Sequence, residues 1–154
     1  MKILLVEDEE KNIESAKMQL KDHDLIIIRS YLQLTRLRNE LWETFNLVLT
    51  DMNLRFGDEK QGWSVEKKYN ENDLVPCGTV VAMNALSMKI PCVMVTDSNG
   101  HIDPVGLLFE NKCGYLLGES KFMACTRPSW IETRFGPGKD WLKAIRNSEL
   151  EFLS

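Results

Sequence analysis

Three carboxylates stand directly after short apolar runs in this sequence. Glu7 and Asp8 follow the run Lys2–Val6, and Asp51 follows the run Leu47–Thr50. Apolar runs of this length are typical of buried strands in a parallel sheet, where ligands bind beyond the carboxyl ends of the strands. We therefore expect the three carboxylates to meet at one edge of a sheet. Like charges so close repel one another, and a hard divalent cation such as Mg²⁺ would relieve that repulsion.

The expected pocket also has the groups for a covalent reaction. With a metal ion shielding an incoming phosphoryl group, the Asp51 carboxylate could act as a nucleophile and form an acyl phosphate. Thr96 ends the apolar run that begins at Ile90, and its hydroxyl could hydrogen-bond a phosphoryl oxygen. Taken singly, each residue has a simpler interpretation: Asp8 as a helix cap, Glu7 as a solvated acid, Asp51 as a turn residue and Thr96 as an ordinary strand residue. Their common position at strand ends favours a shared acidic site.

The elements that must position these residues predict a doubly wound α/β fold. Apolar runs alternate with segments of helical periodicity. The expected strands are Lys2–Val6, Leu25–Arg29, Leu47–Thr50, Ile90–Thr96 and Phe122–Thr126. The expected helices are Glu10–His23, Tyr31–Glu43, Thr79–Met88, Val105–Cys113 and Gly138–Phe152. With right-handed crossovers they form a five-stranded parallel sheet of flavodoxin-like order 2-1-3-4-5, with helices on both faces.

A polar, charged segment at about 55–77 interrupts this regularity. We expect a long loop after the third strand, and loops of this length inside a compact domain are often functional. Its aromatic residues Phe56 and Trp63 could face a partner, although Trp63 could equally pack the loop onto the domain. Pro128–Pro137 also reads as irregular. Because no repeat, linker or low-complexity tract is evident, we expect residues 1–154 to form a single domain.

The composition narrows the functional classes. The chain has 154 residues, a hydrophobic fraction of 44% and a formal net charge of -4, which suits a globular domain with a real core. Its basic residues form no long run, which argues against nucleic-acid binding. No apolar stretch is long enough to span a bilayer, and the N-terminus does not resemble a secretory signal, so we expect a cytoplasmic protein without a membrane partner. The four cysteines form no Cys-x-x-Cys pair, which argues against zinc.

At the residues described above, the sequence resembles the response-regulator receiver family. Lys2–Glu10 (KILLVEDEE) resembles the first strand and acid pair of that family, and Leu47–Leu54 (LVLTDMNL) resembles its phosphoacceptor strand. Ile90–Thr96 (IPCVMVT) resembles the fourth strand with its switch hydroxyl. The resemblance is specific over the first 54 residues and again from about Gly78 to Thr96.

The resemblance implies a role for each of these residues. Asp51 would be the phosphoacceptor and Thr96 the switch hydroxyl, while Glu7, Asp8, Asp51 and the backbone carbonyl of Asn53 would hold Mg²⁺. It also implies a two-component phosphorelay protein, phosphorylated by a histidine kinase or a small phosphodonor. We expect such a chain to signal through a downstream protein partner or through homodimerisation, and not to be a turnover enzyme.

The sequence also departs from the family pattern. Arg55 stands where the family has proline, and Asp97 follows the switch position where the family has a small residue. The family's Lys-Pro after the fifth strand is best matched by Arg127-Pro128, with Lys121 as a fallback; arginine is not equivalent to lysine at such a site. These departures raise an alternative, a pseudo-receiver that acts as a phosphorylation-independent protein-interaction module.

A third alternative is a metal-dependent phosphohydrolase, since acids at strand ends also serve that chemistry. Haloacid-dehalogenase-like phosphatases carry a second aspartate two residues after the nucleophile. This chain has Asn53 at that position, so the phosphohydrolase is the least favoured of the three.

Overall fold

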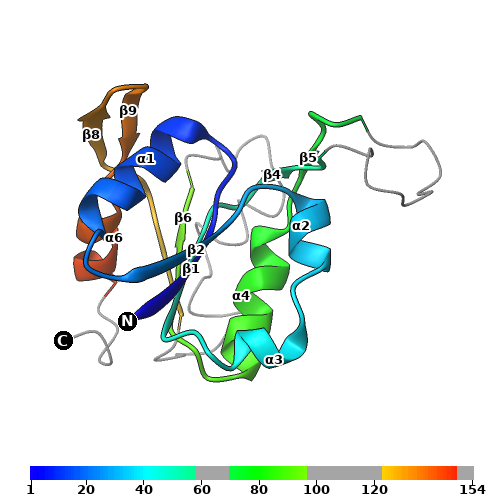
Figure 1. Cartoon of the computed structure of the whole chain (residues 1–154). Coiled ribbons are helices and arrows are strands. Elements are labelled where there is room, and N and C mark those ends of the chain that lie inside the picture. Colours follow the sequence, from blue (N-terminus) through cyan, green and yellow to red (C-terminus); the bar gives the residue numbers. More distant parts are fainter. Residues whose placement is uncertain (58–69, 97–122, 149–154) are drawn as a thin grey trace.

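A five-stranded parallel sheet forms the centre of the computed structural model, which describes residues 1–57, 70–96 and 123–148. The strands lie in the order β2-β1-β3-β6-β7 (Figure 1). Their bounds are β1 Lys2–Val6, β2 Asp24–Ile28, β3 Leu47–Thr50, β6 Cys92–Val95 and β7 Met123–Thr126. Because β4 and β5 belong to a separate hairpin, β6 and β7 are the fourth and fifth strands of this sheet, and its order is 2-1-3-4-5. The predicted fold class is confirmed.

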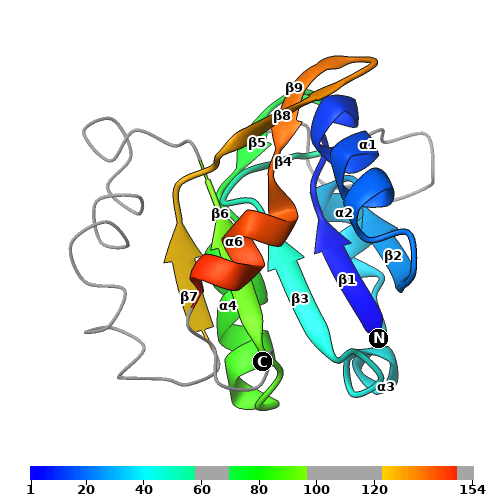
Figure 2. The same cartoon turned by 90° about the vertical axis from the view of Figure 1, so that its left-hand side faces the viewer.

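Helices cover both faces of the sheet, as Figures 1 and 2 show. The helices are α1 Glu10–Gln19, α2 Tyr31–Thr35, α3 Asn39–Trp42, α4 Gly78–Ser87 and α6 Trp141–Asn147. Alternate residues of each strand point to opposite faces. Ile3 and Leu5 of β1 join the core under α1 and α6, whereas Leu4 and Val6 join the core under α2, α3 and α4. Burial of both faces explains why the strands read as continuous apolar runs.

The register brings the carboxyl ends of the central strands to one edge. Val6 of β1 pairs with Thr50 of β3, and Thr50 pairs with Met94 of β6. The residues that follow these strands are therefore neighbours across the edge, as the sequence predicted for Glu7 and Asp51.

Several helix boundaries differ from the prediction. The segment predicted as one helix from Tyr31 to Glu43 forms two short helices, because Arg38 between them is extended at ψ 147°. Ser30 does cap the first of them, its hydroxyl accepting a 3.2 Å hydrogen bond from the Gln33 amide. Helix α6 begins at Trp141 because Asp140 caps it, accepting a 3.0 Å bond from the Lys143 amide.

The prediction of an irregular segment at Pro128–Pro137 is wrong. Strands β8 (Trp130–Thr133) and β9 (Gly136–Lys139) form an antiparallel hairpin there. Gly136, at φ +99°, supplies the left-handed backbone that its turn needs. The hairpin is separate from the main sheet, and Figure 2 shows it beside α1 at the edge towards which β1 runs.

A second short hairpin closes the base of the predicted loop. Strands β4 (Leu54–Arg55) and β5 (Leu74–Val75) pair antiparallel. Phe56, which we expected to face a partner, is instead buried at 3% exposure and stacks on Tyr31 at 5.8 Å between ring centroids. That expectation for Phe56 was wrong, because the residue belongs to the core.

Some predictions fall outside the described residues, namely those on Trp63, Asp97, Lys121 and the helix Val105–Cys113. Within the described ranges, no helix combines the length and the apolar character needed to cross a lipid bilayer.

Candidate functional site

Glu7 and Asp51 lie side by side at the carboxyl edge of the sheet. The Asp51 amide donates a 2.9 Å hydrogen bond to the Val6 carbonyl, which extends the β1–β3 ladder by one residue. The Glu7 side chain is completely buried, whereas 14% of the Asp51 side chain is exposed. Asp51 is therefore the carboxylate of this pair that a reagent from solvent can reach.

A buried lysine joins the two carboxylates. Lys139 Nζ lies 2.8 Å from Glu7 Oε2 and 2.8 Å from Asp51 Oδ2, with 1% of its side chain exposed. Lys139 is the last residue of β9, so the hairpin delivers it to the edge of a sheet to which the hairpin does not belong.

The charges of this trio are set by burial and by each other. Burial alone would lower the pKa of Lys139, but Glu7 and Asp51 outweigh it and raise the pKa, so the lysine stays a cation. Burial raises the pKa of Glu7 and the Asp51 charge raises it further, against the lowering effect of Lys139. Two carboxylates thus share one ammonium group.

Asp8 has a different partner from its neighbour. Arg55 Nε lies 2.9 Å from Asp8 Oδ2, and the Arg55 amide donates to the same oxygen at 3.3 Å. Asp8 does not cap α1, because the cap position is Glu9 and no side chain caps the helix there. Arg55 thus holds one of the carboxylates that the sequence predicted as a metal ligand.

The start of α4 packs against the backbone of Asp51. A Cβ atom at Gly78 would lie 2.2 Å from the Asp51 carbonyl oxygen, so only glycine allows this approach. The Gly78 amide donates a 2.8 Å bond to the Met52 carbonyl, and the Met52 amide donates at 2.6 Å to Asp51 Oδ1. These contacts fix the position of the Asp51 carboxylate.

The other predicted site residues occupy the neighbourhood of this edge. Thr96 directly follows β6, is 9% exposed, and its amide donates to the Thr126 carbonyl at 3.3 Å. Asn53 is half-buried between β3 and β4, and Arg127 is exposed directly after β7. The roles assigned to these three residues stay predictions. Within the described part of the chain, no group of three or more His, Cys, Asp or Glu side chains is arranged to hold a metal ion.

Sequence reasoning missed Lys139 because it placed Gly138 and Lys139 at the start of the last helix. The signal that would have found it is Asp140, a good helix cap followed by the apolar Trp141-Leu142. A helix that starts after Asp140 leaves Lys139 on the segment that enters the helix. In open α/β folds such segments lie at the carboxyl edge of the sheet, where ligands bind.

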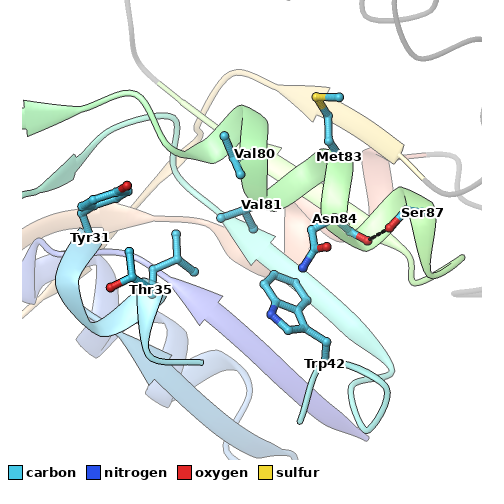
Figure 3. Close-up of a pocket in the computed structure, with 9 residues that line it drawn as sticks. Tyr31, Thr35, Trp42, Val80, Val81, Met83, Asn84 and Ser87 are labelled. Atoms are coloured by element: carbon cyan, nitrogen blue, oxygen red, sulfur yellow. Dashed lines mark hydrogen bonds between the residues drawn. The ribbon is translucent and has the colours of Figure 1, made fainter. Parts of the chain in front are cut away.

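A groove of about 570 Å³ lies on the opposite face of the sheet from α1 (Figure 3). Residues from α2, α3 and α4 line it, among them Tyr31, Trp42, Val80, Met83 and Asn84. None of its lining residues is charged, and none is one of the acids or hydroxyls at the strand ends. The groove is therefore separate from the acidic edge.

The fold and site together define an α/β protein with a lysine-bridged acidic pair at its carboxyl edge. No family model matches the chain, and no curated protein is significantly similar to it. Function must therefore be inferred from the geometry of the site and from the motifs of the sequence.

Proposed function

We propose that this chain is an atypical response-regulator receiver in which Asp51 accepts a phosphoryl group. The observation that carries the proposal is the 2.8 Å contact between Lys139 Nζ and Asp51 Oδ2. A buried cation against a partly exposed carboxylate is placed to stabilise the negative charge of an incoming phosphoryl group, and preorganised charge of this kind is the main source of catalysis in phosphoryl transfer.

In the proposed reaction, an Asp51 carboxylate oxygen attacks the phosphorus of a kinase phosphohistidine or of a small acyl phosphate. A new P–O bond forms while the P–N or P–O bond of the donor breaks, and the donor leaves as imidazole or as a carboxylate. Lys139 then pairs with a phosphoryl oxygen, and the Thr96 hydroxyl donates to another.

Mg²⁺ is part of this proposal because the donors at the edge are oxygens, which this ion prefers. Asp8, Asp51 and the Asn53 carbonyl would hold it, with Glu7 beside them. When bound, the ion would offset the repulsion between the acids and the phosphoryl donor. Arg55 on Asp8 and Lys139 on Glu7 and Asp51 compete with the ion for these oxygens.

The proposed product changes the charge at one edge of the sheet. A phosphoryl group adds charge and acceptor oxygens, and the movement of Lys139 and Thr96 towards it would bias the surface between two states. We infer a cytoplasmic phosphorelay role, with the signal passing to a protein partner or to a second copy of the chain.

One contact favours the alternative of a pseudo-receiver. The Asp8 side chain is 7% exposed and is held by Arg55, so a protein cation already occupies part of the place where the family binds metal. In this alternative, Lys139 and Arg55 neutralise the pocket permanently, and the chain binds a partner without phosphorylation.

The experiment that tests the proposal is phosphorylation of the intact protein by a small acyl phosphate with Mg²⁺, followed by intact-mass measurement. We expect one labile phosphoryl increment in the wild type, none in Asp51→Asn, and slow labelling in Lys139→Gln. No increment in the wild type, where a control receiver is labelled, contradicts the proposal, and an increment that survives Asp51→Asn contradicts the site.

The same assay separates the two candidates. If Arg55→Gln is labelled and the wild type is not, Arg55 blocks the pocket and the pseudo-receiver is the better description of the natural chain. Partner binding that ignores both Mg²⁺ and Asp51→Asn would lead to the same conclusion.

A further inference from the structure

One face of α1 carries polar side chains although it is buried. Asn12, Ser15 and Gln19 follow the spacing of a single helical face. Asn12 is 2% exposed, Ser15 is completely buried and Gln19 is half-buried. Buried polar groups are costly unless they are hydrogen-bonded, so their partners indicate what this face is for.

The partner they share is the backbone of Lys139. Asn12 Oδ1 accepts a 3.1 Å hydrogen bond from the Lys139 amide. The Ser15 hydroxyl donates to the Lys139 carbonyl, and Gln19 Nε2 donates to the same carbonyl at 3.1 Å. Both backbone polar groups of Lys139 are thereby held by α1.

The approach of β9 to α1 is as close as glycine allows. A Cβ atom at Gly138 would lie 2.4 Å from the Lys11 carbonyl oxygen and 2.8 Å from Ser15 Cβ. Directly after β9, Trp141 Nε1 donates a 2.9 Å bond to the Asn12 carbonyl. The chain on both sides of Lys139 is therefore fixed on the same helix.

Within the part of the chain that the structure describes, the hairpin forms no strand pairing with the main sheet. Among the described strands, β9 pairs with β8 alone, whereas the Lys139 ammonium contacts Glu7 and Asp51 beyond β1 and β3. The backbone contacts with α1 are what fix where that ammonium lies.

We propose that Asn12, Ser15 and Gln19 are positioning residues that set the place of the Lys139 ammonium between Glu7 and Asp51. They act through the backbone of Lys139 and form a dock for an element outside the sheet. Their effect on phosphorylation rests on the proposed function of Asp51, but their effect on Lys139 does not.

The test is heteronuclear NMR of the lysine ammonium groups in the full, unphosphorylated chain, with Lys139 assigned by the signal lost in Lys139→Gln. In the wild type we expect a protected ammonium signal that responds to Glu7→Gln. Asn12→Ala and Ser15→Ala should each shift the Lys139 ammonium signal or expose it to solvent exchange. Asn12→Asp should restore the wild-type signal because the accepting oxygen returns. Met18→Ala, on the exposed side of α1, is the control and should leave the signal unchanged. An unchanged signal in folded Asn12→Ala and Ser15→Ala overturns the proposal.

A milder variant keeps the test decisive if those two do not fold. Gln19→Glu keeps the acceptor for the Leu142 amide but removes the donor to Lys139. A change in the shift or in the solvent exchange of the Lys139 ammonium relative to the wild type supports the proposal, and no change opposes it. Phosphorylation by a small acyl phosphate is the second measurement, and misplacement of a positioned group by about 1 Å slows reaction by roughly 100-fold. A shifted ammonium in a chain that is never phosphorylated supports the positioning role and contradicts only the proposed function.

Discussion

The Lys139 ammonium donates a buried 2.8 Å hydrogen bond to Glu7, a residue 132 positions earlier in the chain. This bond connects the end of the first strand with the end of a hairpin that lies outside the sheet. Because the same ammonium also contacts Asp51, one side chain neutralises both a buried and a partly exposed carboxylate.

Replacement of Lys139 by methionine should destabilise the fold strongly. Removal of one member of a buried ion pair leaves the remaining charge uncompensated, and such changes cost about 3–5 kcal/mol. Denaturant unfolding at pH 7 measures the loss, and Lys143→Met, at an exposed position of α6, is the control. A free energy of unfolding equal to that of the control would contradict the structural role of Lys139.

The loss in Lys139→Met should depend on pH in a defined direction. Burial and then Asp51 raise the pKa of Glu7 above its ordinary value of 4.5, and Lys139 lowers it more than the Glu9 amide does. Without Lys139 the folded state binds the Glu7 proton more tightly than the unfolded chain, so stability is present at low pH and is lost as the pH rises through the folded-state pKa. The variant should therefore be less destabilised at pH 5 than at pH 8. Equal losses at the two pH values would show that Glu7 does not carry the uncompensated charge.

Replacement of Asp51 by asparagine should not destabilise the fold. The Asp51 charge raises the pKa of Glu7, so its removal leaves Lys139 to Glu7 alone. Natural proteins are rarely at their stability optimum, so we expect the free energy of unfolding of Asp51→Asn to equal or slightly exceed that of the wild type. Thermal and denaturant unfolding of Asp51→Asn beside the wild type measures the difference. A large loss of stability would mean that Asp51 is a structural residue.

The two glycines of β9 should respond differently to alanine. Gly138→Ala introduces a Cβ that meets the Lys11 carbonyl oxygen at 2.4 Å, and overpacking of this kind costs about 1–3 kcal/mol. It should also displace Lys139. Gly136→Ala meets nothing within 4 Å but retains φ +99°, which costs about 1–2 kcal/mol in a residue with a side chain. Unfolding measurements give the two costs. The Lys139 ammonium signal should change only in Gly138→Ala. A change in both variants would show that the close approach of Gly138 to α1 is not what places Lys139.

The sequence was a good guide wherever burial alone decides the structure. The bounds of β1 and β3 agree with the prediction because both strands are covered on two faces, and their apolar runs end where the chain reaches the edge. The same reasoning brought Glu7 and Asp51 together, since adjacent parallel strands in register must end side by side.

The hairpin and its lysine could not be predicted in this way. The strand β9 consists of Gly-Pro-Gly-Lys, a composition that lacks β propensity and suggests a turn. It is ordered by tertiary contacts with α1, such as the bond between the Lys139 amide and Asn12. The pairing of Asp8 with Arg55 was hidden for a related reason, because it depends on a short hairpin between β4 and β5 that encloses a long connection.

Arg55 gives the sharpest test of whether the acidic edge binds metal. Arg55→Ala removes the cation from Asp8. Because half of the Arg55 side chain is exposed, we take the range for surface ion pairs, about 0.2–1 kcal/mol, and Mg²⁺ should then bind roughly 1.4- to 5-fold more tightly. Arg55→Lys keeps the positive charge and is the matched control. Calorimetric titration with Mg²⁺ provides the measurement, with Asp51→Asn as the variant in which binding should weaken. If Mg²⁺ affinity is the same in the wild type, Arg55→Ala and Asp51→Asn, the ion binds elsewhere or not at all. The acidic edge would then be neutralised by its own lysine and arginine, as the pseudo-receiver alternative requires.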